Sequence, residues 1–319
     1  MTSTTAVSQV DPGSFSWDSP SGVSAGVRRV VAAATASDGR GPLDEAAVLS
    51  LRHSGLTKSA LWVAGSSHGF ALADAPPGTS GDVEVNLVVA PSSRGEGVGR
   101  ALAAAALDVF PDARVSAWSH GNHPAAAALA SSFGFDRVRD LWIMRRSLHD
   151  ALPEVRDIEA TVVRTFEPGR DEDAFLELNA LAFADHPEQG SLTRTDLEQR
   201  MAEDWFDPTG FFLAESRRAG SGDSVKLLGF HWTKVHAMDP PYGEVYVVGV
   251  SPDAQGMGLG KVLTLTGLHH LRSRGLDEVI LHVESGNAAA VKVYAGLGFT
   301  HAEEDTDVMY RRARATSRP

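Results

Sequence analysis

The chain has 319 residues, about twice the length of one ordinary domain, so we expect two domains and an internal duplication is worth seeking. Hydrophobic residues make up 43% and charged residues 22%, which excludes disorder over most of the chain. The 29 basic and 41 acidic residues give a formal charge of −12, which disfavours broad binding to nucleic acid or anionic membranes. The lack of cysteine excludes disulfides, thiolate metal ligands and a cysteine nucleophile.

The first 22 residues contain no lysine or arginine and no apolar run of signal-peptide length. No stretch of the sequence approaches about 18 uninterrupted apolar residues, the length that a membrane-spanning helix needs. These features predict a cytoplasmic protein with a flexible N-terminus over residues 1–22.

Two blocks of sequence recur in the same order. The segment Asn86–Leu102 (NLVVAPSSRGEGVGRAL) resembles Val247–Leu263 (VVGVSPDAQGMGLGKVL), 161 residues later. The segment Asn122–Phe135 resembles Gly286–Phe299, 164 residues later. The chain is therefore interpreted as a tandem pair, with domains at 23–154 and 155–319 separated near residue 155 in the charged stretch SLHDALPEVRDIEA.

The elements of each half follow the order strand, glycine-rich loop, helix, strand, helix, strand. In the second half we expect them, in chain order, at residues 244–250, 251–260, 261–275, 278–285, 287–298 and 307–312. Strands that alternate with helices predict an α/β fold, with a central sheet that contains at least one parallel pair and is flanked by helices.

The glycine loop of the second half is predicted to bind an anion. Gly256, Gly258 and Gly260 come directly before a helix, where backbone N–H groups and the helix dipole favour phosphate. The dinucleotide fingerprint fails, because Lys261 stands where its third glycine would be, and the P-loop fails because Val262 follows that lysine. A structural glycine turn is the alternative, but the motif Q-x-x-G-x-G recurs in the first half as R-x-x-G-x-G.

This motif, followed by a strand, an asparagine, an alanine-rich helix and L-G-F, resembles the acyl-CoA-binding core of the GNAT acetyltransferases. The resemblance implies two tandem GNAT domains, each a mixed central sheet flanked by helices, with acetyl-CoA as co-substrate and no metal. In the second half the implied CoA-binding residues are Val248, Gly249, Val250, Gln255, Gly256, Met257, Gly258, Leu259, Gly260, Lys261, Asn287, Ala288, Ala289, Ala290, Val291 and Lys292. In the first half they are Val88, Val89, Ala90, Arg94, Gly95, Glu96, Gly97, Val98, Gly99 and Arg100.

Further strings extend the resemblance beyond the common core. AFADHPEQG, EDWFDPTG, LLGFHWTKVH and GEVYVVGVSP are similar to the tandem GNAT enzymes that complete mycothiol biosynthesis. The resemblance implies direct acetyl transfer to the cysteinyl amine of desacetylmycothiol, without a covalent enzyme intermediate, by a protein that we expect to be a monomer.

Two residues of the second half suit the chemistry of amide formation. A base must deprotonate the amine, and Glu244 lies on a strand whose alternation would place it on one face with Tyr246, Val248 and Val250. Tyr294 matches the tyrosine that donates a proton to the departing CoA sulfur in GNAT enzymes. The alternatives are a solvated carboxylate for Glu244 and packing against Phe299 for Tyr294.

The resemblance also implies contacts with the acceptor. These contacts are assigned to Glu45, Glu188, Lys234, Glu244 and His282. His282 departs from the family pattern, in which a tyrosine is expected. A surface position is the alternative for Lys234 and Glu188. A metal site among His231, His236, His269 and His270 is disfavoured, because residues five apart on a strand point to opposite faces and adjacent helical residues diverge.

The first half retains the glycine loop but not the catalytic pair. Ala130 aligns with Tyr294, and Val83 aligns with Glu244, although Glu84 lies one residue away. We expect this half to be catalytically silent while it binds acetyl-CoA. A GNAT enzyme for another small amine, and an acyl-CoA-binding sensor, are the alternative functions.

Overall fold

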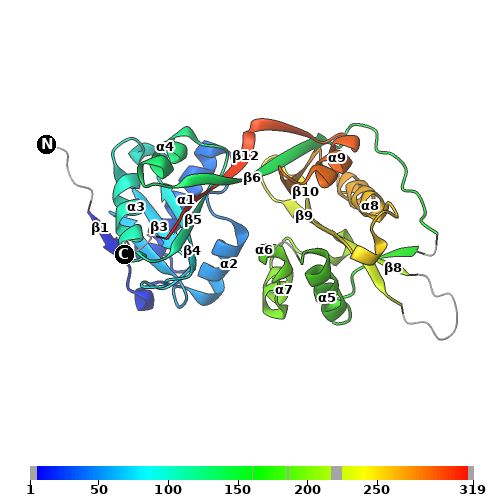
Figure 1. The fold of residues 1–319 in the computed structure, drawn as a ribbon, viewed down its shortest axis with the longest axis horizontal. Coiled ribbons are helices and arrows are strands. Elements are labelled where there is room, and N and C mark those ends of the chain that lie inside the picture. Colours follow the sequence, from blue (N-terminus) through cyan, green and yellow to red (C-terminus); the bar gives the residue numbers. More distant parts are fainter. Residues whose placement is uncertain (1–5, 160, 185–186, 217–224, 315–319) are drawn as a thin grey trace. The chain divides into compact units, whose positions relative to one another are not determined.

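The structure is a computed structural model and describes residues 6–159, 161–184, 187–216 and 225–314 (Figure 1). The chain divides into two compact units, Met1–Leu141 with Glu303–Pro319, and Trp142–Ala302. The divisions fall inside two long strands, β6 (Asp136–Ser147) and β12 (Thr300–Arg312). The first unit therefore includes the last strand of the chain.

This division differs from the expected single boundary near residue 155. Residues 148–159 are irregular, as their sequence suggested, but they connect β6 to β7 within the second unit. The transition instead lies within uninterrupted strands, where no proline or glycine marks it. A composition-based boundary could not have located it.

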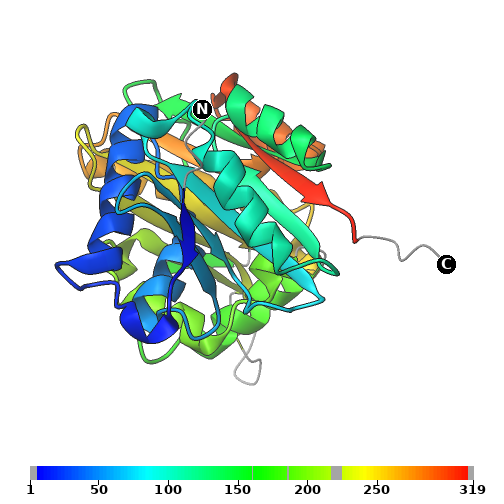
Figure 2. The same ribbon diagram turned by 90° about the vertical axis from the view of Figure 1, so that its left-hand side faces the viewer.

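The first unit is built on a sheet of strand order β1-β2-β3-β4-β5-β12, in which β4 and β5 are parallel. Its remaining elements are β1 (Val7–Gln9), α1 (Gly22–Asp38), α2 (Glu45–Ser54), β2 (Ala60–Ala64), β3 (Gly69–Ala73), β4 (Asp82–Val89), α3 (Val98–Asp108), β5 (Arg114–Ser119) and α4 (Pro124–Ser132). Helix α3 packs on one face of this sheet through Leu102 and Ala106. Helices α1 and α2 cover the other face through Val27, Val30 and Leu51 (Figure 2).

The N-terminal segment differs from the flexible stretch that we expected over residues 1–22. Val7–Gln9 form β1 and pair antiparallel with Trp62–Ala64 of β2. Val10 and Phe15 are buried in the core beneath α1. Two apolar side chains in a polar context are too weak a pattern to predict a strand, but burial of both stabilises the segment.

The second unit has the strand order β6-β11-β10-β9-β8-β7, in which β10 and β11 are parallel. Its other elements are β7 (Thr161–Thr165), α5 (Glu172–Ala182), α6 (Pro187–Gly190), α7 (Arg194–Met201), β8 (Phe211–Ser216), β9 (Leu227–His236), β10 (Tyr242–Val250), α8 (Leu259–Ser273), β11 (Glu278–Glu284) and α9 (Ala288–Gly296). The expected α/β class and the parallel pairs are confirmed.

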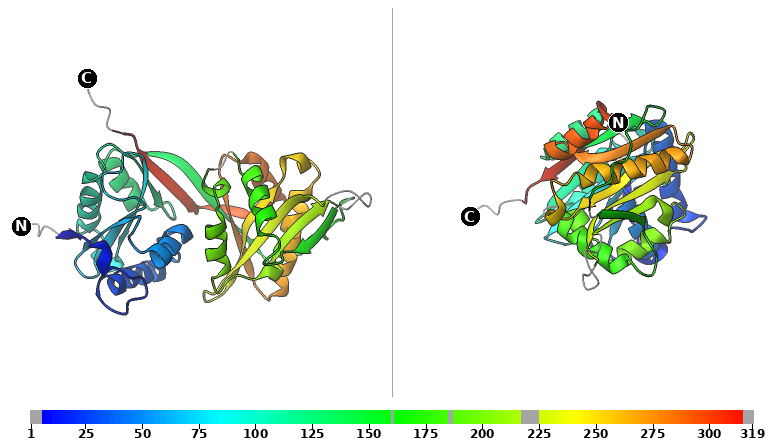
Figure 3. Two further views of the ribbon diagram at one scale, coloured as in Figure 1. Left: turned by 90° about the horizontal axis from the view of Figure 1, so that it is seen from below. Right: turned by 90° about the vertical axis from the view of Figure 1, so that its right-hand side faces the viewer.

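The two faces of the second sheet have different cores. Helix α8 packs against one face through Leu265, Leu268 and Leu271. Helices α5 and α7 pack against the other face, where Phe211 stacks on Trp232 with ring centroids 4.7 Å apart (Figure 3). None of the helices in the described ranges combines the length and the apolar character needed to cross a bilayer.

Candidate functional site

The predicted phosphate loop lies exposed at the N-terminus of α8. Gly256 and Gly258 have φ values of +82° and +80°, a backbone conformation that favours glycine. Helix α8 begins at Leu259, two residues earlier than expected, so that Gly260 and Lys261 belong to its first turn. The first N–H groups of a helix have no partner within it, so this turn can donate to an anion.

A β-bulge interrupts β10, the strand that leads into this loop. The register with β9 pairs Glu244 with Lys234 and Val245 with Thr233, and then shifts before Val247, which pairs with Trp232. Tyr246 is therefore an extra residue. A bulge of this kind reverses the faces that the following side chains occupy.

The bulge corrects the predicted alternation of β10. Glu244 and Tyr246 share the face of Lys234, since Tyr246 packs with the aromatic cluster of α5 and α7. Val248 and Val250 lie on the opposite face, where they pack with the residues of α8 and α9 and with Leu259. The strand thus presents its carboxylate to one side of the sheet and the predicted CoA-binding valines to the other.

Glu244 is buried between two histidines. Its Oε2 atom accepts a hydrogen bond from Nε2 of His236 at 2.6 Å, and its Oε1 atom accepts one from Nδ1 of His282 at 3.1 Å. Burial raises the pKa of Glu244, but the hydrogen bonds and the positive charges of the two imidazoles together outweigh burial and hold that pKa below its ordinary value. The carboxylate is therefore ionised at neutral pH, and its burial is at odds with the alternative of a solvated strand-end group.

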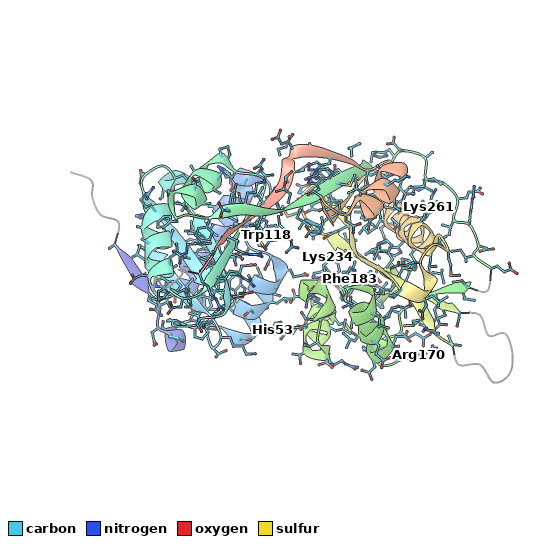
Figure 4. The ribbon with its side chains drawn as sticks, viewed as in Figure 1. His53, Trp118, Arg170, Phe183, Lys234 and Lys261 are labelled. Atoms are coloured by element: carbon cyan, nitrogen blue, oxygen red, sulfur yellow. The ribbon has the colours of Figure 1, made fainter. Side chains whose placement is uncertain are left out.

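Lys234 lies in an aromatic cage on the same face. Its Nζ atom is 4.2 Å from the ring centroid of Trp205 and 5.1 Å from that of Tyr246. Arg200 of α7 donates a hydrogen bond to the Tyr246 hydroxyl at 3.0 Å. Figure 4 labels Lys234 on this side of the strands and Lys261 beside α8.

Tyr294 is half-buried on α9. Its ring meets the edge of Phe299 with centroids 5.9 Å apart, so the packing contact weighed from the sequence is present. Burial raises the pKa of Tyr294 to about 12, so the phenol keeps its proton at neutral pH. Both a packing role and a proton-donating role are compatible with this position.

The second predicted CoA segment forms the start of α9. Asn287 is the N-cap residue, and its side chain accepts a hydrogen bond from the backbone N–H of Ala290 at 3.1 Å. Lys292 is exposed one turn further along the helix. The asparagine of the motif therefore has a local structural function in starting this helix.

Two of the predicted acceptor contacts are not tested by the geometry of this cluster. Glu45 is the first residue of α2 and belongs to the other unit. Glu188 lies in α6, and its side chain is outside the described residues. Lys234, Glu244 and His282 do come together on one face of the second sheet.

The first unit contains a cavity of about 700 Å³ at its own glycine loop. Arg94, Gly95, Gly97, Gly99 and Arg100 line it, together with residues of β4 and β5. Gly95 and Gly97 have φ values of +78° and +85°, which match those of their counterparts in the second loop. The cavity has the size and the anion-binding rim that a nucleotide-containing ligand requires.

Arg94 makes an ion pair that its counterpart Gln255 cannot make. Its guanidinium donates to both carboxylate oxygens of Asp38 at 2.8 and 2.6 Å, and Nε donates to the carbonyl oxygen of Val89 at 3.2 Å. This pair lowers the pKa of Asp38 below its ordinary value. The two loops thus have the same backbone conformation at their glycines but begin with different side chains, Arg94 in the first unit and Gln255 in the second.

The pairing register of β4 and β10 changes which residue of the first unit corresponds to Glu244. In the first unit Ala73 pairs with Val85, and Glu84 pairs with Ser116 of β5. In the second unit Thr233 pairs with Val245, and Glu244 pairs with Ile280 of β11. Because β4 lacks the bulge in its pairing with β3, the counterpart of Glu244 is Glu84 rather than Val83.

The described residues contain no group of three or more potential metal ligands. His231 is buried and donates from Nδ1 to the carbonyl oxygen of Leu263 at 2.7 Å. Burial lowers its pKa to about 4, so the ring is neutral at physiological pH. This histidine contributes to the core beneath α8.

Sequence reasoning missed three residues of the site. His236 was considered only as a metal ligand, and Trp205 and Tyr246 were not given a role. Lys234 and His236 are two residues apart on one strand, and this spacing indicates from the sequence that both lie on the same face. Trp205 comes from the loop after α7 and gave no such signal.

Comparisons with known proteins agree with this architecture. The sequence profile of the acetyltransferase (GNAT) family matches residues 54–135 and 175–299. The chain belongs to the GNAT family and is an acetyl-CoA-dependent acetyltransferase. Its relatives include a mycothiol acetyltransferase of Nocardioides sp., 52% identical over 298 residues that cover 90% of this chain and 97% of that protein. Another, from Thermobispora bispora, is 53% identical over 287 residues, which cover 88% of this chain and 92% of that protein.

Solved structures support the tandem fold. A tandem GNAT protein from the clavulanic acid biosynthesis pathway has a TM-score of 0.71 at 21% identity and covers 98% of this chain and 100% of its own. A GCN5-related N-acetyltransferase from Sphaerobacter thermophilus has a TM-score of 0.64 at 23% identity, and the match covers 96% of this chain and 95% of that one. The predicted resemblance to tandem GNAT enzymes of mycothiol biosynthesis is confirmed.

Proposed function

We propose that this acetyltransferase moves the acetyl group of acetyl-CoA to the cysteinyl amine of desacetylmycothiol, the final step of mycothiol biosynthesis. Identity of about half to mycothiol acetyltransferases over nearly the whole chain supports this acceptor. The observation that carries the proposal is the polar face of the second sheet, where Lys234, Glu244 and His282 converge beside the bulge.

The bulge supports a direct transfer between two substrates. The glycine loop and the valines of β10 lie toward α8, so acetyl-CoA is bound there, and Glu244 lies on the opposite face, where the amine is received. The register of β10 with β11 covers Gly243–Val245, and both strands continue beyond it. The thioester then meets the amine where these two strands diverge, without a covalent enzyme intermediate.

The catalytic residues of the proposal are Glu244 and Tyr294. Glu244, with the imidazoles bonded to it, draws the proton from the amine, and Tyr294 protonates the sulfur as the C–S bond breaks. The raised pKa of Tyr294 keeps the donor protonated, and the phenol regains its proton from water. Lys234 and His282 hold acceptor hydroxyl groups, as Glu45 and Glu188 do.

The first unit is proposed to bind acetyl-CoA without turning it over. The cavity and the glycine loop support binding. Glu84 keeps the carboxylate, but Ala130 replaces Tyr294, and β4 pairs with β3 without a bulge. Loss of the acid supports a silent unit.

The experiment combines purified protein, acetyl-CoA and desacetylmycothiol, followed by mass spectrometry of the product and by CoA release. We expect N-acetylated product with one CoA released per amide, at kcat/KM at least tenfold above that for simple amines such as cysteamine and glucosamine. Preference for another amine would favour a different GNAT activity, and binding without turnover would favour a sensor. Light scattering tests the expected monomer, and fractionation of cells tests the expected cytoplasmic location.

A further inference from the structure

The carboxylate of Glu244 is less accessible than the imidazoles around it. Its side chain is 9% exposed, whereas that of His236 is 25% exposed and that of His282 is 36% exposed. Each carboxylate oxygen accepts a hydrogen bond from one ring. An amine that approaches this face meets an imidazole before it meets the carboxylate.

The hydrogen bonds fix which nitrogen of His236 can act as a base. Carboxylate oxygens accept and do not donate, so Nε2 of His236 carries the hydrogen that Glu244 accepts at 2.6 Å. In the neutral ring the lone pair then lies on Nδ1. Tyr242 stacks on the ring with centroids 4.5 Å apart at 15°, which fixes the plane in which that lone pair points.

We propose that Nδ1 of His236 is the immediate proton acceptor for the substrate amine, and that Glu244 holds the ring in its reactive tautomer. The arrangement has the logic of a histidine that acts as base while a buried carboxylate orients it. His282 donates to the second carboxylate oxygen and keeps Glu244 ionised. This inference rests on the proposed acetyl transfer and assigns the proton to a particular atom.

The charges that face His236 come from each neighbouring strand. Glu244 and Tyr242 lie on β10, His282 lies on β11, and Lys234 lies two residues away on β9. Lys234 directs its ammonium group to the rings of Trp205 and Tyr246. The carboxylate of Glu244 therefore offsets the charge that His236 acquires on protonation.

The ammonium group of the acceptor gives one proton to Nδ1 of His236, and the freed electron pair forms the C–N bond with the thioester carbonyl carbon. The C–S bond breaks with its electron pair moving to sulfur, which takes a proton from Tyr294. The amide nitrogen loses its second proton to water, Tyr294 regains one from water, and His236 releases its proton to solvent.

The test compares His236→Gln with His236→Ala. The amide of glutamine can donate to Glu244 from nearly the position of Nε2, but it cannot accept a proton. We expect kcat/KM for desacetylmycothiol to fall by roughly 10²-fold or more in both variants. We expect imidazole in the buffer to raise the rate of His236→Ala by roughly tenfold, more strongly for more basic imidazoles.

The matched control is His149→Ala, which removes another histidine bonded to a carboxylate in the same unit. His149 pairs with Asp277 at 3.0 Å on the exposed surface. We expect its activity to match the parent protein and to gain nothing from imidazole. Thermal unfolding of all variants separates a folding defect from a catalytic one.

Full activity and an unchanged pH profile in His236→Gln would overturn the inference, because holding Glu244 would then suffice. Failure of imidazole to rescue a folded His236→Ala protein would also overturn it, as would a loss confined to His282→Gln. Failure of the proposed function is a separate result: the parent protein would not acetylate desacetylmycothiol. The variants would then be compared on whichever amine the parent accepts.

Discussion

The phenol of Tyr294 packs against Phe299 and is also assigned the role of acid, and one substitution separates these two roles. Tyr294→Phe keeps the ring contact and removes the hydroxyl, so we expect unchanged thermal stability and acetyl-CoA affinity. If the phenol protonates the sulfur, kcat falls by roughly 10² or more, and an acyl donor with a more acidic thiol recovers much of the loss.

The pKa of this residue adds a second measurement. An acid works while it holds its proton, and burial raises the pKa of Tyr294 to about 12. Ionisation of Tyr294 therefore removes activity only above about pH 11. A decline of kcat between pH 8 and 10 that disappears in Tyr294→Phe would contradict the raised pKa of Tyr294, whereas full activity of the variant would make Tyr294 a packing residue.

The spacing of residues along one strand indicates part of the site. Lys234 and His236 are two residues apart on β9, a spacing that puts both side chains on one face, and both side chains lie with Tyr246 and Glu244. The hydrogen bonds of Glu244 could not be predicted from the sequence. His282 lies on β11, which pairs in parallel with the strand of Glu244 after a long crossover. A single sequence shows neighbours along one strand, whereas register between strands depends on packing.

A single inserted residue distinguishes strand β10 from strand β4. Tyr246 forms the bulge, and the residues around it are those of an ordinary strand, so the sequence does not indicate a bulge there. The predicted elements of the second half were otherwise close to those observed, with α8 beginning two residues early and β12 extending to Thr300. The repeat thus predicted the helices and strands well, while the face that each side chain occupies depended on a feature without a sequence signature.

The two glycine loops allow a matched experiment. Gly97 and Gly258 precede α3 and α8 with φ values of +85° and +80°, and a Cβ atom at either would contact nothing within 4 Å. Gly97→Ala and Gly258→Ala should each cost about 1 kcal/mol of stability through backbone strain alone. We expect a several-fold higher KM for acetyl-CoA in Gly258→Ala and unchanged turnover in Gly97→Ala.

Steady-state kinetics and thermal unfolding measure both effects. Equal losses of stability would show that the substitutions are comparable, so that any difference in KM reflects ligand binding. An equal rise of KM in both variants would mean that the first loop takes part in turnover. Calorimetric titration of Gly97→Ala then reports on the binding proposed for the first unit.

The division of the chain predicts that the first unit is incomplete without residues 303–312. These residues pair with β5 through Val308–Arg312, and the buried carboxylate of Asp307 accepts hydrogen bonds from Arg40, His120 and the backbone of Gly121. We expect a protein cut at residue 155 to lose cooperative unfolding, because Arg40 and His120 lose this partner and an edge of β5 is exposed.

A fusion that adds residues 300–314 to that fragment through a flexible linker should restore a cooperative transition. Asp307→Ala in the fusion serves as the control and should lower its stability by about 3 kcal/mol. Circular dichroism during urea unfolding measures all three proteins. A stable, cooperative fragment 1–155 would show that the last strand is dispensable and would favour the boundary expected from sequence.

The place of β12 also bears on the order in which a nascent chain becomes structured. Domains generally fold as they leave the ribosome, with the N-terminal one first. Here the first unit must wait for residues of β12 that are synthesised only after the whole segment Trp142–Ala302. The edge of β5 that pairs with β12 is therefore exposed while the second unit is synthesised, and this is the period in which we expect chaperones to associate with the chain.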